Sequence, residues 1–378
     1  MKRAAAIVDL AAIRGNLERI HSLAGNAAVM AVVKADAYGH GMAPVARTAR
    51  RAGVPWLGVA LPSEALALRA QGDEGRVLAW LWSPGDPDIA ACVRADVDLS
   101  VSSTWAVDDV AEAARRVGRS ARVHIKVDTG LSRNGATAEQ LPEVLRRVVD
   151  AMVEGVIEVE GIWSHLADGD TPDAASVRDQ RDRFEQALAD ADALGIRPRL
   201  RHIANSGALF AHPDCHYDLV RTGIAMYGLT PAPALGTSAE LGITPAMTLV
   251  ARLAHVKGLP PGTGVSYGRT WVAQDETAVG LVPVGYADGI PRGAGNRIPV
   301  AIDGALFPIV GRVAMDQFVV DLGTRNLPHV GDDVYVFGPG QHGEWTADQW
   351  AGALDTIGYE IVTRLGTRVP REYVGATS

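Results

Sequence analysis

The chain has 378 residues, of which 47% are hydrophobic and 21% charged, and its formal net charge is −8. These values are typical of a soluble globular protein with a sizeable core and exclude a disordered or fibrous chain. No basic stripe is present, so we expect neither nucleic acid nor a membrane as a partner. The length suits a barrel of about 250 residues together with a smaller domain.

The N-terminus and the cysteines indicate the compartment. Two basic residues open the chain, but Asp9 and Arg14 interrupt any apolar segment before a signal peptide could form. No window approaches the roughly 20 apolar residues that span a bilayer. Cys92 and Cys215 lie far apart without metal-ligand spacing, which favours ordinary thiols and no structural metal. We therefore expect a cytoplasmic protein.

Between about residue 28 and residue 230, short apolar runs alternate with stretches of helical periodicity, which is the pattern of repeated βα units. Eight such units can be counted. The predicted strands are Val29–Val33, Trp56–Ala60, Arg76–Leu81, Asp98–Val101, Arg122–Val127, Gly155–Trp163, Leu200–Ile203 and Asp218–Arg221.

Helical stretches lie between these strands and before the first one. They include Leu10–Ala24, Ala43–Ala52, Ser63–Ala70, Trp105–Val117 and Asp173–Leu194. A doubly wound sheet would favour a glycine-rich phosphate loop after its first strand, and here that place holds Lys34–Tyr38. The pattern therefore favours a (β/α)₈ barrel of the TIM type over residues 10–238.

After about residue 240, Val- and Leu-rich runs follow one another between Pro/Gly turns, which predicts a mainly antiparallel β domain. We expect it to comprise residues 239–378 together with a strand from residues 1–9. One short helix, Thr346–Leu354, is expected before the segment Tyr359–Val362. The predicted strands are Ala246–Lys257, Glu276–Pro283, Pro299–Ile302, Ala305–Val310, Gln317–Asp321 and Asp333–Phe337.

Lys34 ends the first barrel strand, which places its amine at the C-terminal mouth where barrel enzymes have their active sites. A lone lysine there is more often an ordinary solvated side chain, but the surrounding run VKADAYGHG, Val33–Gly41, resembles the pyridoxal-phosphate (PLP) attachment motif of the alanine racemase family. The resemblance covers nearly the whole chain. Further matching segments follow in the family's order: Lys126–Gly135, His202–Gly207, Arg221–Gly228, Val265–Gly268 and Gly311–Gln317.

The resemblance implies a PLP enzyme with two bases. Lys34 would carry the cofactor and act on one face of the substrate, serving the D-antipode. Tyr267 would reach the opposite face from a partner subunit and serve the L-antipode, so activity would require a homodimer. A free tyrosine has a pKa near 10, and the resemblance places His165 and Arg221 close enough to assist it.

The resemblance also implies the cofactor contacts. Arg221 would hydrogen-bond the pyridine nitrogen and, being permanently protonated, would leave that nitrogen without a proton. Barrels commonly bind phosphate with the loops after strands seven and eight, which is where Ser206, Gly223 and Ile224 lie. The family match adds further cofactor-binding residues: Tyr38, His165, Asn205 and Tyr359.

The substrate would be an amino acid bound through its carboxylate. By resemblance, Arg133 would lie beside that carboxylate, positioned by a carbamylated Lys126. Met315, through its backbone amide, and Asp316 would come from the partner subunit. The alternative for their side chains is that Met315 packs in the core and Asp316 belongs to a turn.

The implied activity is interconversion of L- and D-alanine, which supplies D-alanine for peptidoglycan. Three alternatives stay open. A racemase of serine, lysine or a broader range would share most of these residues, although Tyr359 and Met315 resemble residues that keep the pocket small. A PLP decarboxylase of the same fold would carry a different C-terminal region. A non-catalytic PLP-binding protein would consist of the barrel alone.

Overall fold

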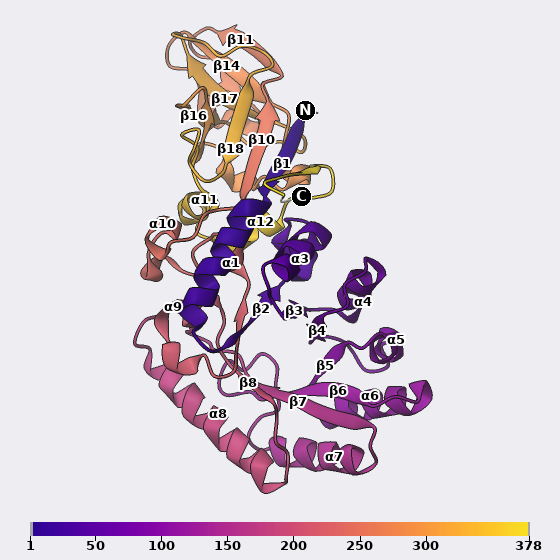
Figure 1. Ribbon diagram of the computed structural model, residues 1–378. Coiled ribbons are helices and arrows are strands. Elements are labelled where there is room, and N and C mark those ends of the chain that lie inside the picture. The colour runs from indigo at the N-terminus through magenta and orange to yellow at the C-terminus, as the bar shows by residue number, and fades with distance from the viewer. Residues whose placement is uncertain (1–2, 377–378) are drawn as a thin grey trace.

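Eight parallel strands form a nearly closed barrel in the computed structural model, which describes residues 3–376 (Figure 1). They are hydrogen-bonded in the order β8-β7-β6-β5-β4-β3-β2-β9. Two backbone hydrogen bonds of 3.1 Å cross the remaining seam, from Asp218 to Arg201 and from Arg221 to Ala204. The predicted barrel is confirmed, with strands β2 Ala28–Val32, β3 Trp56–Val59, β4 Arg76–Ala79, β5 Asp98–Val101, β6 Ala121–Lys126, β7 Ile157–Trp163, β8 Leu200–His202 and β9 Leu219–Thr222.

Helices surround the barrel, and the ring is completed by α1, a helix that precedes the first barrel strand. Asp9 caps α1 by accepting hydrogen bonds from the amides of Ala11 and Ala12. The helix contacts both α3 and α9 and so occupies the place between them. The ring consists of α1 Leu10–Ala24, α3 Met42–Arg51, α4 Pro62–Ala70, α5 Asp88–Arg94, α6 Thr104–Val117, α7 Leu141–Val153, α8 Ala175–Ala193 and the short α9 Ser206–Ala211.

A nine-stranded sheet forms the second lobe, in the order β11-β14-β17-β16-β15-β18-β10-β1-β19. The first strand of the chain, β1, pairs antiparallel with β10 and parallel with β19. Residues 1–2 and 377–378, which the predicted β domain includes, lie outside the described range. The strands are β1 Ala4–Asp9, β10 Met247–Arg252, β11 His255–Leu259, β14 Thr277–Val282, β15 Pro299–Ile302, β16 Ala305–Val310, β17 Phe318–Gly323, β18 Asp333–Phe337 and β19 Arg371–Val374.

One predicted strand of this lobe is wrong. Ala246–Lys257 is not continuous, because the chain breaks at Leu253 and Ala254, whose amides bond to Asp332 and to Leu281. The first part, β10, is an inner strand of the sheet, and the second part, β11, lies at an edge beside β14. The two strands differ in burial, since β10 is mostly buried and β11 is mostly exposed, but no Pro or Gly turn separates them in the sequence.

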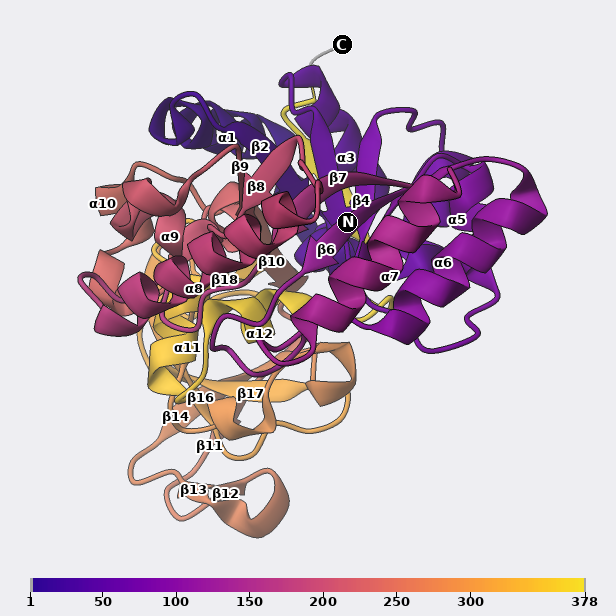
Figure 2. The same ribbon diagram turned by 90° about the horizontal axis from the view of Figure 1, so that it is seen from below.

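Short elements complete the fold. A two-stranded arm, β12 Gly264–Val265 and β13 Trp271–Val272, projects from the β lobe (Figure 2). The predicted helix is present as α11 Ala347–Ala353, and Tyr359 lies on a further helix, α12 Gly358–Thr363. The remaining helix and 3₁₀ turns are α10 Ser238–Leu241, η1 Pro213–Cys215, η2 Ile224–Tyr227, η3 Pro233–Leu235, η4 Tyr267–Arg269, η5 Tyr286–Asp288 and η6 Arg292–Ala294.

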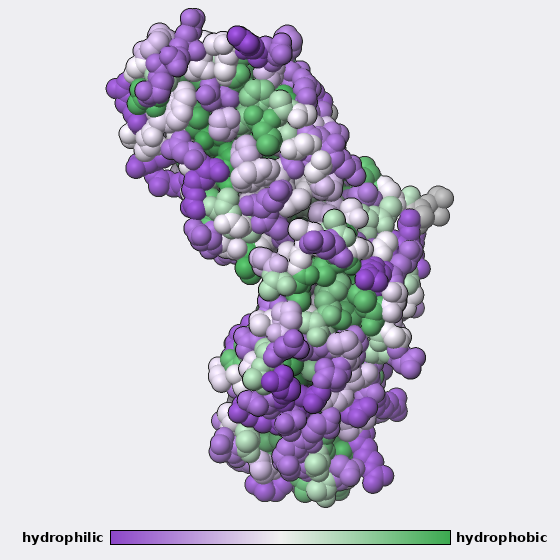
Figure 3. Space-filling view, turned by 90° about the vertical axis from the view of Figure 1, so that its left-hand side faces the viewer, coloured by the Kyte–Doolittle hydropathy of each residue, from purple (hydrophilic) through white to green (hydrophobic). Residues whose placement is uncertain are grey.

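The two lobes meet at a narrower waist where apolar side chains gather (Figure 3). Helix α12 of the C-terminal part packs there on the segment after β2, so closely that a Cβ at Gly39 would lie 2.5 Å from the Val362 carbonyl oxygen. Arg371 of β19 also donates to the Gly39 carbonyl oxygen at 2.8 Å. The carboxyl ends of the barrel strands therefore lie beside the β lobe. Within residues 3–376, none of the helices combines the length and the apolar character needed to cross a membrane.

Candidate active site

A cavity of about 470 Å³ lies at the carboxyl ends of the barrel strands. Its size is that of a site for a small molecule or cofactor. It brings together eleven of the predicted site residues: Lys34, Tyr38, Lys126, Arg133, His165, Asn205, Ser206, Arg221, Gly223, Ile224 and Tyr359. The other lining residues are Val32, Ala35, Trp80, Trp163 and Thr363.

Lys34 enters this cavity from the start of an unusual turn, α2 Lys34–Tyr38. Its last four residues, Ala35 to Tyr38, have φ angles between 52° and 54°, so the turn is left-handed. Non-glycine residues adopt this conformation at a cost of about 1–2 kcal/mol each. The turn is held by side chains: Glu64 accepts from the Ala35 amide at 2.7 Å, and Asp36 accepts from the Met42 amide at 2.7 Å. Lys34 is thus fixed by a strained, braced backbone.

The surroundings of Lys34 favour a neutral amine. Burial lowers its pKa, the positive charge of Arg133 lowers it further, and the carboxylate of Glu64 opposes both. The amine lies 5.9 Å from the centre of the Trp80 ring. A lysine with a lowered pKa at the mouth of a barrel is a candidate nucleophile and base.

Arg221, on the strand next to the one that precedes Lys34, also lines the cavity, and its guanidinium is held by hydrogen bonds. It donates to the carbonyl oxygens of Ser164 at 2.8 Å and Ile203 at 3.2 Å. It also donates to Nδ1 of His202 at 3.1 Å and Nδ1 of His165 at 3.2 Å. Burial lowers the pKa of Arg221 to about 9, which still leaves it protonated at neutral pH. Burial, followed by the charge of Arg221, lowers the pKa of His165, so that imidazole is neutral.

Small and hydroxyl-bearing residues form a cradle at one end of the cavity. The Ser206 hydroxyl accepts hydrogen bonds from the amides of Gly223 at 3.0 Å and Ala225 at 3.5 Å. A Cβ at Gly223 would lie 2.3 Å from the Tyr38 hydroxyl oxygen, so this position requires glycine. Burial raises the pKa of Tyr38 and of Tyr359, which keeps both hydroxyls protonated. The cradle therefore offers the hydroxyl donors of Tyr38, Ser206 and Tyr359, a set that suits an anion.

Lys126 and Arg133 flank the cavity from one strand and its loop. The Lys126 amine lies 4.4 Å from the centre of the Trp163 ring. Burial, together with the charges of Arg221 and Arg133, lowers the pKa of Lys126 to about 7. The loop that carries the exposed Arg133 is folded back by Asp128, which accepts from the amides of Gly130 and Ser132.

Three predicted site residues lie outside the cavity of their own chain. Tyr267 is 69% exposed and Met315 is 53% exposed, both on the β lobe. Their loops are neighbours, because the Ser266 hydroxyl donates to the Arg312 carbonyl oxygen at 2.6 Å. Asp316 is also exposed and accepts a hydrogen bond from Arg368 at 2.7 Å. One end of the β lobe thus presents two large side chains to solvent.

The sequence assigned no role to Trp80, Trp163, His124 or His202, although His202 begins one of the matching family segments. Strand alternation gave a signal for one of them: His124 and Lys126 are two apart on β6, so both face the barrel interior. Asn205 lines the cavity, but its side chain caps α9 by accepting from the Ala208 amide at 3.0 Å.

Two family models cover this chain. The alanine racemase N-terminal domain matches residues 8–231, and the alanine racemase C-terminal domain matches residues 246–373. The chain belongs to the alanine racemase family.

Curated relatives and solved structures of that family agree over the full length. The alanine racemase of Streptomyces coelicolor is 52% identical over 98% of this chain and 96% of its own length. The alanine racemase of Mycobacterium tuberculosis is 48% identical over 98% of this chain and 96% of its own length. The crystal structure from Streptomyces lavendulae has a TM-score of 0.98 at 51% identity, covering 100% of this chain and 98% of the other. The structure of a Bartonella henselae alanine racemase with covalently bound pyridoxal phosphate has a TM-score of 0.88 at 28% identity. It covers 99% of this chain and 100% of the other.

Proposed function

We propose that this protein is an alanine racemase that uses PLP to interconvert L- and D-alanine, supplying D-alanine for peptidoglycan. The observation that carries the proposal is the placement of Lys34, Arg221 and the hydroxyl-rich cradle around one cavity. Membership of the family over both domains supports it.

The residues present fit PLP. Lys34 would form the covalent attachment, and the phosphate would bind Tyr38, Ser206, Gly223, Ile224 and Tyr359, where a side chain at position 223 would leave no room. Arg221 would donate to the pyridine nitrogen without protonating it, because an arginine keeps its own proton. When bound, PLP supplies the electron sink that makes the Cα proton of an attached amino acid removable at neutral pH.

Racemisation requires a proton carrier on each face of the substrate. Lys34, with its lowered pKa, would serve one face. We infer that Tyr267 of the partner subunit serves the other, since Tyr267 is 69% exposed and lies outside the cavity of its own chain. Met315 and Asp316 of the β lobe would enter beside it and contact the substrate carboxylate. This arrangement makes the protein a homodimer with shared sites.

A complementation experiment tests the shared site. Lys34→Ala and Tyr267→Phe should each be inactive alone. When the two variants are unfolded together and refolded, about half of the dimers should be mixed, and each mixed dimer holds one site free of both changes. About a quarter of the wild-type activity should therefore return. Mixing two preparations of Lys34→Ala is the control. No recovery in a mixture that forms mixed dimers would contradict the shared site.

Lys126 is proposed to carry a carbamate. The reaction joins the neutral amine to carbon dioxide and releases a proton, and a pKa of about 7 supplies the neutral amine. The resulting anion would lie between the cations of Arg133 and Arg221 and orient Arg133 toward the substrate. A ¹³C carbamate resonance after addition of labelled bicarbonate, lost in Lys126→Arg, is the expected result. Its absence at saturating bicarbonate would exclude the modification.

Substrate choice is tested by circular dichroism of alanine, serine and lysine solutions incubated with the holoenzyme. We expect the optical rotation of alanine to decay to zero while that of lysine persists. Decay of lysine with retention of alanine would reject the alanine assignment. Release of carbon dioxide from any of the three would favour a decarboxylase.

A further inference from the structure

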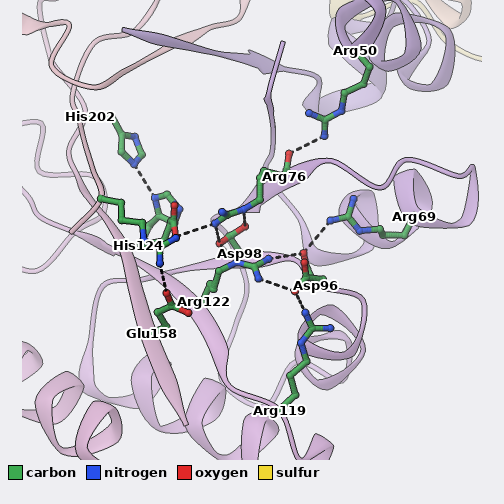
Figure 4. A network of polar contacts seen from close by, with 12 residues as sticks. Arg50, Arg69, Arg76, Asp96, Asp98, Arg119, Arg122, His124, Glu158 and His202 are labelled. Carbon is green, nitrogen blue, oxygen red and sulfur yellow. Dashed lines mark hydrogen bonds and ion pairs between the residues drawn. The ribbon is translucent and has the colours of Figure 1, made fainter. Parts of the chain in front are cut away.

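Two buried histidines lie in line below Arg221, in the interior of the barrel. Arg221 donates to Nδ1 of His202 at 3.1 Å. Nε2 of His202 lies 2.9 Å from Nδ1 of His124, and Figure 4 shows this second contact. Neither histidine has any exposed surface. The line therefore runs from the cavity toward the amino ends of the strands without contact with solvent.

The chemistry of arginine decides where the protons of this line lie. A guanidinium only donates, so Nδ1 of His202 must be the acceptor and its proton must be on Nε2. That N–H donates to Nδ1 of His124, whose proton is in turn on Nε2. Burial lowers the pKa of His124 to about 3 and also lowers that of His202, so both rings are neutral. Both hydrogen bonds consequently run in one direction, from Arg221 to His202 and from His202 to His124.

The sequence makes room for this line. Strand β7 carries a bulge, in which Val159 and Gly161 pair with consecutive residues of β6 and Glu160 is left over. A Cβ at Gly161 would lie 2.3 Å from Nδ1 of His124, so glycine is needed for the ring to lie there. The Trp163 ring stacks on His202 with an interplanar angle of 6°. The line is thus fixed by packing as well as by hydrogen bonds.

The far end of the line lies next to an anion. Nε2 of His124 and Oε2 of Glu160 are both buried without a hydrogen-bond partner among the described residues, and the charge of Glu160 acts on His124. Glu160 lies 3.3 Å from Arg76, which is paired with Asp98 at 2.7 Å. Figure 4 shows this cluster of arginine and aspartate side chains beside the histidines. The negative charge of Glu160 raises the pKa of His124, but burial outweighs this effect and the ring stays neutral.

We propose that His124 is a positioning residue for Arg221, which it holds through His202. Nδ1 of His124 gives the Nε2–H of His202 a buried acceptor, and this favours the tautomer and the ring orientation in which His202 accepts from Arg221, and thereby the orientation of the guanidinium. The kinetic consequence rests on the proposed function, whereas the proton positions do not.

The direct test is ¹⁵N NMR of the histidine rings in the protein labelled with [¹⁵N]histidine at pH 8. The chain has 10 histidines, and His124→Asn identifies the His124 signals by their loss. We expect both His124 and His202 to be neutral and protonated on Nε2. An Nδ1–H form of either ring overturns the proposal, whether or not the protein racemises alanine.

Kinetics of the holoenzyme separate positioning from mere packing. His124→Leu removes the acceptor and should lower kcat by about tenfold or more with little change in KM, because the displaced guanidinium acts on the reaction rather than on substrate capture. His124→Asn places an amide oxygen near the position that Nδ1 of His124 occupies in the wild type. This variant should therefore keep much of the wild-type kcat. Met30→Leu, a buried change on the apolar side of the barrel interior, is the control. Equal kcat values in the His124→Leu and Met30→Leu variants would overturn the proposal.

Discussion

The four left-handed residues after Lys34 show how a single turn can set the geometry of a site. The turn places Tyr38 in the cradle beside Gly223, only four residues after the lysine. Residues in sparsely populated conformations persist where the surrounding structure determines them. Here Glu64 and Asp36 provide that support.

Ala35→Gly should stabilise the protein. Ala35 is exposed at a φ of 52°, a conformation that glycine adopts without steric cost. We expect an increase of about 0.5–1 kcal/mol in the free energy of unfolding, measured with denaturant on the cofactor-free protein. The same substitution at Ala67, inside the right-handed helix α4, should have the opposite sign. A loss of stability in both variants would show that the turn is not strained.

Gly223→Ala should weaken PLP binding. The added Cβ would lie 2.3 Å from the Tyr38 hydroxyl oxygen, so either the hydroxyl moves or the loop does, and the cradle is lost in both cases. A reduction of about tenfold or more in PLP affinity is expected, since hydrogen bonds to a charged phosphate contribute about 1.5–3 kcal/mol each. Gly352→Ala, on the open face of α11 with nothing within 4 Å, is the matched control and should bind PLP normally. Unchanged affinity in Gly223→Ala would remove this loop from the proposed cradle.

At the scale of elements, the alternation of apolar runs and helical stretches was sufficient to predict the barrel. Period and length carried that information, and the predicted strand and helix ends differ from the observed ones by only a few residues. Three features could not be read in this way: the break after β10, the bulge at Glu160 and the left-handed turn. Each depends on a partner distant in sequence, namely β14, the His124 ring and Glu64.

The site was predictable to a different extent. The residues that line the cavity follow from their family motifs, whereas His124 and Trp163 required the structure. The bulge in β7 reverses which face of that strand points inward, so a two-residue period alone would have misplaced Trp163. Alternation along β6 places His124 on the same face as Lys126, but its contact with His202 required the structure.

Asp9→Ala should weaken the start of α1. Its carboxylate accepts from the Ala11 amide at 2.8 Å and the Ala12 amide at 3.2 Å. Loss of such a cap costs about 1 kcal/mol of stability, and Asp9→Asn should retain most of it because asparagine caps about as well as aspartate. Thermal unfolding of the three proteins checks the order. A midpoint for Asp9→Asn as low as that of Asp9→Ala would assign the effect to charge and not to the cap.

At the scale of the whole molecule, Asp288 ties the two ends of the chain to the β lobe. Its carboxylate lies 2.6 Å from Arg3 and 3.2 Å from Arg368. Burial alone would raise the pKa of Asp288, but the hydrogen bond from Arg3, the Gly285 amide and the two arginine charges outweigh it, and the pKa lies below its ordinary value of 3.8. The ionised form is therefore the one that stabilises the fold.

The resulting pH dependence has a definite sign. A carboxylate with a lowered pKa stabilises the folded state fully above its unfolded pKa and loses that contribution as pH falls through its folded pKa. Asp288→Asn should cost about 1–2 kcal/mol at pH 7, a range that allows for the partial exposure of both arginines. The difference between the two proteins should shrink below about pH 4. A difference that stays constant down to pH 2 would contradict the role of charge.

The place of β1 in the nine-stranded sheet has a consequence for synthesis on the ribosome. Residues 4–9 are made before the barrel, yet their neighbours are β10 Met247–Arg252 and β19 Arg371–Val374. At bacterial and eukaryotic rates of about 5–20 residues per second, the first strand waits on the order of ten seconds or longer before either neighbour has been made. The barrel can assemble around α1 during that interval, while the strand attached to it remains unpaired. A strand that is made before the barrel thus reaches its final neighbours only after the barrel has been made.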